Sequence, residues 1–152
     1  MTSASPEHEE FMGQAIEVAR QNPQAPFGSV LVDRRVGKVV ARGVNSSSAN
    51  PTFHGEIAAI NDYVQQGGKD WSELTLYTTA EPCCMCQGAL LWAGVDNVVF
   101  GIAIADLKQL GWRQIDIPAT EVVERSWSPD VQVVGGVRRD ECLELFERVR
   151  RN

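Results

Sequence analysis

The segments 52-TFHGEIAAINDY-63 and 80-AEPCCMCQGALLWAG-94 decide how this chain folds. Each continues into an apolar pattern with the spacing of a helix, and each begins with side chains that bind metals. His54 opens the first helical pattern, and Cys83 and Cys86 lie in the expected first turn of the second. Two helix starts that carry metal ligands predict a single site where the two helices begin.

Alternating strand and helix patterns surround these two segments. A first helix is predicted from Ser5 and Pro6, which suit the N-cap and the first helical position, to the turn 22-NPQAP-26. Strands are predicted over 28–33, 37–45, 73–79, 95–101 and 131–137. This order predicts an α/β layered fold with a largely parallel second half.

Three further helices complete the prediction, and Pro82 is expected at the first position of the one that carries the cysteines. That helix is expected to close at Gly94. The helix after His54 should end at 67-GG-68 and bury Ile57, Ala58, Ile60 and Val64. The last helix should bury Cys142, Leu145, Phe146 and Val149. Residues 102–129 carry no clear pattern.

The size and composition of the chain indicate which broad class of protein it belongs to. A chain of 152 residues is expected to form a single domain, residues 1–152 with 1–5 flexible, and to need no disulfide or structural metal. It has no apolar run of the ~20 residues that span a membrane. The start MTSASPEHEE lacks the pattern of a secretion signal. Four cysteines in such a chain favour metal ligands or core thiols and a cytoplasmic location.

The sequence offers three candidate metal ligands, and this number distinguishes a catalytic from a structural metal site. Cys83 and Cys86 face one side of a helix, whereas Cys84 is turned by about 100°. His8 belongs to the first helix, and Cys142 is expected to be a core thiol. A structural zinc takes four protein ligands, whereas a catalytic zinc keeps one position open for water. One imidazole and two thiolates therefore favour a catalytic Zn²⁺.

The glutamate beside the histidine fits the same chemistry. Zinc can lower the pKa of water from about 15.7 to near 7. Glu56, two residues from His54, is expected to carry a proton from this water to a departing amine. The alternatives are a redox pair of Cys83 and Cys86 and a packing role for His54.

The pattern 54-HGE-56 followed by 82-PCCMC-86 resembles the H-x-E and P-C-x-x-C signature of the cytidine deaminase superfamily. Four segments are similar, in order, to its branch of guanine deaminases and tRNA adenosine deaminases: PFGSVLVD (26–33), ARGVNSSSANPTFHGEIAAI (41–60), LYTTAEPCCMC (76–86) and NVVFG (97–101). The resemblance implies a three-layer α/β/α sandwich with a five-stranded mixed sheet, usually dimeric. It also implies zinc on His54, Cys83 and Cys86 and proton transfer by Glu56.

The resemblance also implies substrate contacts. Asn45 would bind the base through its amide, and Phe27 and Trp92 would line the base pocket, with a packing role as the alternative for both aromatic residues. Gly55 stands where the family often has alanine. This change to glycine should preserve the ligand geometry and loosen the helix start. The stretch 101–127 matches neither branch well. Its candidate contacts are Asp106, Trp112 and Asp116, with a surface or packing role as the alternative for each.

Three functions are open. The favoured one is hydrolysis of an exocyclic amine on a free base such as guanine, isocytosine or an aminotriazine, supported by 26-PFG-28, 90-LLWA-93 and the net charge of −6. The second is tRNA adenosine-to-inosine deamination, supported by 131-VQVVGGVRRDECLELFERVRR-151. The acidic charge disfavours it, because binding a polyanion depends on positive charge. The third is a non-enzymatic module, which needs a fourth zinc ligand or a Cys83–Cys86 disulfide.

Overall fold

A computed structural model describes residues 5–150 of the chain, with side chains up to residue 147. The elements in chain order are α1 (Pro6–Ala19), β1 (Gly28–Asp33), β2 (Lys38–Val44), α2 (Gly55–Gln65), β3 (Leu74–Ala80), α3 (Cys84–Ala93), β4 (Asn97–Ile102), α4 (Ile104–Gln109), α5 (Ala119–Glu124), β5 (Gln132–Val134) and α6 (Arg139–Arg150). Ser5 caps α1 as predicted, because its side chain accepts the backbone N–H of His8 at 3.1 Å. The predicted flexibility of residues 1–5 otherwise concerns residues outside the described range.

The strands form one five-stranded mixed sheet in the order β2-β1-β3-β4-β5. β1 is antiparallel to both β2 and β3. β3, β4 and β5 run parallel to one another. The predicted mixed sheet with a parallel second half is confirmed.

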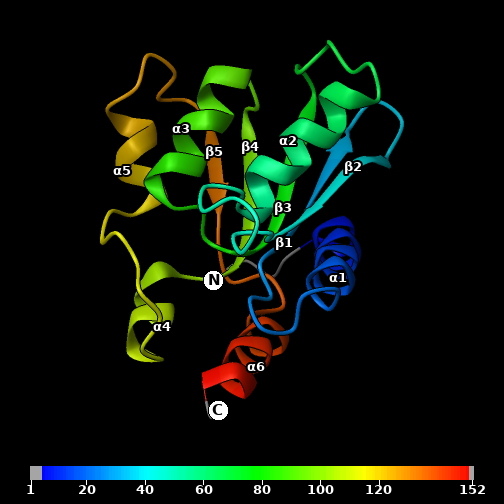
Figure 1. Ribbon diagram of the computed structural model, residues 1–152. Coiled ribbons are helices and arrows are strands. Elements are labelled where there is room, and N and C mark those ends of the chain that lie inside the picture. The colour runs from blue at the N-terminus through cyan, green and yellow to red at the C-terminus, as the bar shows by residue number, and fades with distance from the viewer. Residues whose placement is uncertain (1–4, 151–152) are drawn as a thin grey trace.

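Helices cover both faces of the sheet, which makes three layers (Figure 1). Side chains on one face of the strands, such as Val30 and Tyr77, pack in one core with residues of α1 and α6. Their neighbours on the opposite face, such as Leu31 and Leu76, pack in a second core with residues of α2 and α3. The alternation follows from the two-residue period of a strand, and it confirms the predicted three-layer sandwich.

The face that α2 buries matches the prediction in part, because Ile57, Ala58 and Ile60 are half-buried and Ile60 packs against the second core. Val64 is 54% exposed, and the buried residues of the helix are Gly55, Glu56 and Ala59. The helix lies so close to β2 that a Cβ at Gly43 would be 2.2 Å from the backbone nitrogen of Ala59. Small residues therefore form the contact between α2 and β2, whereas the apolar pattern in the sequence indicates large side chains such as Val64.

Two predicted boundaries are also wrong. α3 begins at Cys84 with Cys83 as its N-cap, so Pro82 lies before the helix rather than at its first position. The last strand has only three residues, because Gly136 adopts a left-handed φ of 85° and turns the chain toward α6. In α6, Cys142 and Phe146 are buried as predicted, and the side chain of Val149 lies outside the described range.

Candidate functional site

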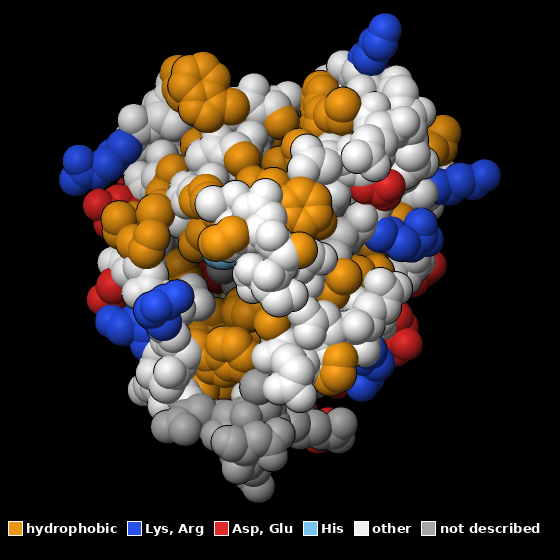
Figure 2. Space-filling model, in the orientation of Figure 1, with side chains coloured by type: hydrophobic (Ala, Val, Ile, Leu, Met, Phe, Trp, Pro, Cys, Tyr) orange, Lys and Arg blue, Asp and Glu red, His pale blue; other side chains and the backbone are white. Residues whose placement is uncertain are grey.

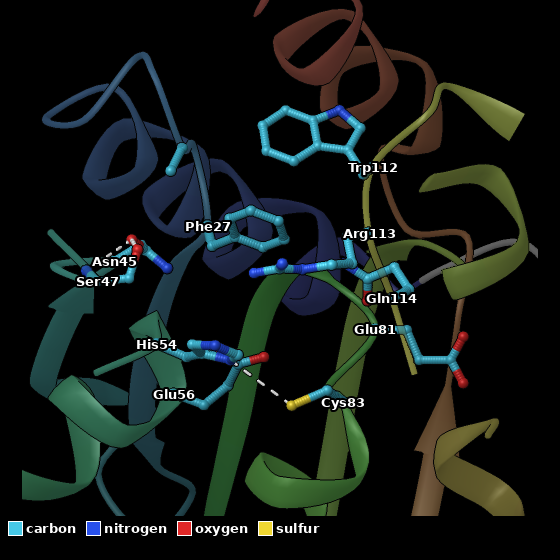
Figure 3. A pocket seen from close by; sticks show the side chains of 11 residues that line it. Phe27, Asn45, Ser47, His54, Glu56, Glu81, Cys83, Trp112, Arg113 and Gln114 are labelled. Carbon is cyan, nitrogen blue, oxygen red and sulfur yellow. Dashed lines mark hydrogen bonds between the residues drawn. The ribbon is translucent and has the colours of Figure 1, made fainter. Parts of the chain in front are cut away.

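The topology brings five chain segments to one edge of the sheet. β3 and β4 end there, and because β1 is antiparallel to β3, β1 begins there. Phe27 precedes β1, and Asn45 follows β2 and donates its backbone N–H to the carbonyl of Phe27 at 3.0 Å. His54 and Cys83 occupy the N-cap positions of α2 and α3 at the same edge. The two segments that suggested a common site therefore meet (Figure 3).

His54, Cys83 and Cys86 form a cluster of possible metal ligands whose donor atoms all lie within 4.8 Å of one another. Nδ1 of His54 is 3.6 Å from Sγ of Cys83 and 3.5 Å from Sγ of Cys86. Within the described residues this is the one such cluster. One nitrogen and two sulfur donors fit zinc with a fourth position left for another ligand.

The other histidine and the remaining cysteines do not complete a four-ligand site. Nδ1 of His8 is 2.8 Å from the hydroxyl oxygen of Tyr77. Cys142 is buried behind β4, where a Cβ at Gly101 would be 2.3 Å from its sulfur. Cys84 is half-buried beside the cluster without belonging to it. The expected count of three ligands holds for the described residues.

The thiols and the imidazole share protons. The pKa of Cys83 is lowered to about 4, first by a hydrogen bond from Cys86 and then by one from His54. The pKa of Cys86 is raised by that hydrogen bond to Cys83 and by burial. The pKa of His54 is raised, chiefly by its hydrogen bond to Cys83. A metal ion would displace these protons, so its binding should weaken in acid.

Glu56 lies beside the cluster and is not one of its ligands. Its side chain belongs to the first turn of α2 and is 4% exposed. The hydroxyl of Thr78 donates to Oε2 of Glu56 at 3.4 Å. Burial raises the pKa of Glu56 to about 7. A carboxyl group with such a pKa can both accept and donate a proton near neutral pH.

A cavity of about 240 Å³ opens above the cluster. Figure 2 shows hydrophobic side chains gathered around a hollow on this face of the molecule. The cavity is lined by Ala25, Phe27, Asn45, Ser47, His54, Glu56, Glu81, Cys83, Trp112, Arg113 and Gln114. Phe27 and Trp112 pack edge to face with ring centroids 5.5 Å apart. The volume lies just below the range of about 300–1,000 Å³ for pockets of drug-sized ligands, which suits a small flat molecule.

Asn45 faces this cavity with a defined orientation of its amide. Its Oδ1 accepts hydrogen bonds from the backbone N–H and the hydroxyl of Ser47, at 3.0 and 2.8 Å. The amide nitrogen is left without a partner in the described residues, and Figure 3 shows Asn45 beside the cavity. Asn45 therefore offers a hydrogen-bond donor to a ligand.

Three other residues that were predicted as possible substrate contacts lie outside the cavity. Trp92 does not line the cavity: it is 80% exposed and packs against Trp127, with ring centroids 4.5 Å apart. Asp106 accepts the backbone N–H of Ala103 and pairs with Arg139, and Asp116 pairs with Lys108 at 2.7 Å. Neither aspartate lines the cavity.

Glu81 and Arg113 were missed by the sequence reasoning. Glu81 is 8% exposed, and its carboxylate accepts the backbone N–H of Ile104 at 2.9 Å and that of Ala119 at 2.7 Å. It thereby holds the starts of α4 and α5. A charged residue directly after an apolar strand was the available signal for Glu81, whereas Arg113 lies in a segment without a pattern.

Gly55 allows a close backbone approach at the site. A Cβ at this position would be 2.5 Å from the carbonyl oxygen of Phe27. The glycine that departs from the family's frequent alanine therefore fits α2 tightly against the chain before β1.

The chain matches the family described as the cytidine and deoxycytidylate deaminase zinc-binding region over residues 5–102. It belongs to that deaminase family. The matched segment contains all three cluster residues and Glu56. Zinc is the cofactor of this deaminase domain, and the cluster of His54, Cys83 and Cys86 is a possible site for it.

The proteins that are similar to this chain have names that indicate different substrates. A probable cytosine deaminase of Schizosaccharomyces pombe is 30% identical over 140 residues, which cover 88% of this chain and 86% of that protein. A tRNA-specific adenosine deaminase of Streptococcus pyogenes is 34% identical over 143 residues, covering 90% and 80%. The solved structure of guanine deaminase from Nitrosomonas europaea has a TM-score of 0.82 and 27% identity, and covers 100% of this chain and 88% of that one. In the part of the chain that the structure describes, every helix is too short or too polar to cross a membrane.

Proposed function

We propose that this protein catalyses zinc-dependent hydrolytic deamination of a free nucleobase or related heterocycle of the guanine, isocytosine or aminotriazine type, with release of ammonia. The observation that carries the proposal is a three-ligand zinc cluster with a buried, non-ligating glutamate at the floor of a small cavity. Zinc, when bound, supplies the Lewis acidity that makes water nucleophilic at neutral pH.

In this proposal, Glu56 moves the proton. It takes one proton from the attacking water and delivers it to the ring nitrogen, and it then takes the second proton from the added hydroxyl group and delivers it to the exocyclic amine, which leaves as ammonia. Its burial supports the role, because the raised pKa of about 7 suits proton transfer in both directions. The cavity is open at the surface (Figure 2), so a base can enter and ammonia can leave.

Asn45 and Phe27 would hold the base over the cluster. The free amide nitrogen of Asn45 would donate to a carbonyl oxygen or ring nitrogen of the base. The ring of Phe27, supported by Trp112, would pack against the heterocycle and keep water from it. This arrangement fixes the reacting carbon near the metal, and such positioning is a large part of enzymatic rate enhancement.

The alternative is a tRNA-specific adenosine-to-inosine deaminase. Its support is the similarity of the C-terminal segment to that branch and the relative from Streptococcus pyogenes. Against it stands the net charge of −6. Binding to tRNA that falls steeply with salt would favour this alternative.

The test is ammonia release by the zinc-loaded protein from guanine, isocytosine, an aminotriazine, cytosine, adenine and a tRNA anticodon stem-loop. We expect turnover of a guanine-type base, and Glu56→Gln should lower kcat by about 10²-fold or more at unchanged zinc content. Glu121→Gln, a change of an exposed glutamate on α5, is the matched control. Turnover of the stem-loop alone, or undiminished turnover by Glu56→Gln, contradicts the proposal.

We further propose a homodimer in a reducing cytoplasm. Trp92 and Trp127 are 80% and 62% exposed and Val134 is 41% exposed, and large exposed apolar groups are typical of interfaces. None of the four cysteines, all of which lie within the described residues, forms a disulfide, as expected in a reducing compartment. Light scattering should give a dimer that Trp92→Ser with Trp127→Ser weakens, whereas Val36→Ser on the β1–β2 turn should not. A monomeric wild-type protein, or disulfide-linked protein in cells, contradicts these proposals.

A further inference from the structure

Arg113 is a charged residue that lines the cavity. It lies in the segment between α4 and α5, and its side chain lines the same cavity as Phe27 and His54. Figure 3 shows this side chain reaching from its loop toward the space between Phe27 and His54. Most other arginines with described side chains pair with a carboxylate, whereas Arg113 has no hydrogen bond or ion pair within the described residues.

The loop that carries Arg113 is fixed on both sides. The preceding residue, Trp112, packs edge to face against Phe27 and against Phe146, at centroid distances of 5.5 and 5.4 Å. Its backbone N–H also donates to the carbonyl of Leu107 at 3.0 Å. Arg113 is thus held at the mouth of the cavity by the packing of its neighbour.

The far side of the loop is fixed by charge. Asp116 pairs with Lys108 at 2.7 Å, which closes the loop back onto α4. Ala119, at the start of α5, donates its backbone N–H to the carboxylate of Glu81 at 2.7 Å. With both ends anchored, the loop holds the backbone of Arg113 at the mouth of the cavity, and its exposed side chain reaches into the cavity (Figure 3).

Two polar groups of the cavity lining, on Arg113 and Asn45, offer free hydrogen-bond donors. A guanidinium has five N–H donors and no acceptor, and Asn45 offers only its amide nitrogen because Ser47 occupies its oxygen. The fork of an arginine matches two adjacent acceptors, as when it binds O6 and N7 of guanine. Guanine carries these two atoms across the ring system from its 2-amino group.

We propose that Arg113 determines specificity by binding the edge of the base that presents a carbonyl oxygen beside an unprotonated ring nitrogen, as O6 and N7 of guanine do. This inference rests on the proposed deaminase function and narrows its substrate class to oxopurines with a 2-amino group. Isocytosine and cytosine present only one acceptor at the corresponding edge, so they bind one arm of the fork. The base is then held with its amine at the metal cluster and its acceptor edge at Arg113.

The probe for this inference is 7-deazaguanine, which replaces N7 of guanine by a C–H group and keeps the rest of the base. We expect the wild-type kcat/KM for guanine to exceed that for 7-deazaguanine by about tenfold or more. Arg113→Met should lose most of this preference, and Arg113→Lys should retain part of it because a lysine binds one acceptor. The matched control is Arg125→Met, which removes an exposed arginine at the C-cap of α5 that is not part of the cavity. An equal preference in Arg113→Met and wild type overturns the inference.

Direct binding separates this inference from the proposed function. Calorimetric Kd values for guanine and 7-deazaguanine are measured on Glu56→Gln and on Glu56→Gln with Arg113→Met, where neither ligand is consumed. We expect the first protein to prefer guanine by about tenfold and the second to bind the two ligands alike. If the wild-type protein deaminates no base but this pattern holds, the proposed function fails and the recognition by Arg113 stands. If guanine is deaminated but the two proteins show the same preference, only the inference about Arg113 fails.

Discussion

Replacing Glu81 by glutamine removes the charge that holds the starts of α4 and α5. The carboxylate is 8% exposed and accepts one backbone N–H with each oxygen, from Ile104 at 2.9 Å and from Ala119 at 2.7 Å. Glutamine has one carbonyl oxygen and one amino group, so it can accept from only one of these donors. The other N–H then faces an amino group.

The free-energy cost follows from these two bonds. A buried donor left without a partner costs about 1–3 kcal/mol, and the remaining bond weakens by about 1 kcal/mol when its acceptor loses its charge. The free energy of unfolding should therefore fall by about 2–4 kcal/mol. For a domain of this size, about 2–4 °C of Tm corresponds to each kcal/mol, so Glu81→Gln should lower Tm by about 5–15 °C.

The assay is thermal and urea unfolding of the zinc-saturated protein, followed by circular dichroism. Glu121→Gln is the control, because Glu121 makes only an exposed ion pair with Arg125 at 3.4 Å, and such pairs are worth about 0–1 kcal/mol. Since the loop with Trp112 and Arg113 lies between the two bonds of Glu81, Glu81→Gln should also raise KM at unchanged zinc content. A Tm within 1–2 °C of the control, well inside the expected shift, would refute the reasoning.

Four further predictions concern the site and the core. Cys86→Ser should reduce zinc from about one ion per chain to well under half in metal analysis, because a hydroxyl is a poor zinc ligand; full zinc retention would disprove the ligand assignment. Asn45→Ala should raise KM for the base and leave zinc unchanged, and unaltered kinetics would remove this residue from the site. Gly55→Ala should destabilise the protein by about 1–3 kcal/mol in urea unfolding, because the added methyl group would be 2.5 Å from the carbonyl oxygen of Phe27; an unchanged midpoint would show that α2 has room to move. Burial raises the pKa of Tyr77 from 10.0 to about 12. The folded state therefore keeps the phenol proton up to a higher pH than the unfolded state does. The free energy of unfolding that this difference contributes is fully present below pH 10 and should be lost as the pH rises toward 12. Tyr77→Phe should flatten that decline in urea titrations between these pH values, and an equal slope would argue against the shift.

The clustering of the three candidate ligands and the fold class were predictable because they depend on spacing. Metal ligands must converge, so a histidine and two cysteines three apart at helix starts restrict the arrangement strongly. The two-residue period of the strands likewise separates Val30 from Leu31 between the two cores. Such patterns are reliable predictors because the local geometry of a helix or strand determines which side chains share a face.

Features that depend on long-range packing were not predictable from the same patterns. The buried face of α2 is set by its close approach to Gly43, so Val64 is exposed although it continues the apolar stripe. The loop with Arg113 has no period, and its position is fixed by the distant residues Glu81 and Phe146. Trp92 follows the cysteines on α3 but points away from the cavity, because the helix turns it toward Trp127.

The central claim is that water replaces the exocyclic amine of a small heterocycle at the cluster of His54, Cys83 and Cys86. The most direct test is to incubate the zinc-loaded protein with guanine in ¹⁸O-labelled water and to measure ammonia and the mass of the product together. Hydrolytic deamination predicts one ¹⁸O atom in the product for each ammonia released, and loss of both signals after zinc removal. Ammonia without the label, or equal turnover by the zinc-free protein, would contradict the account.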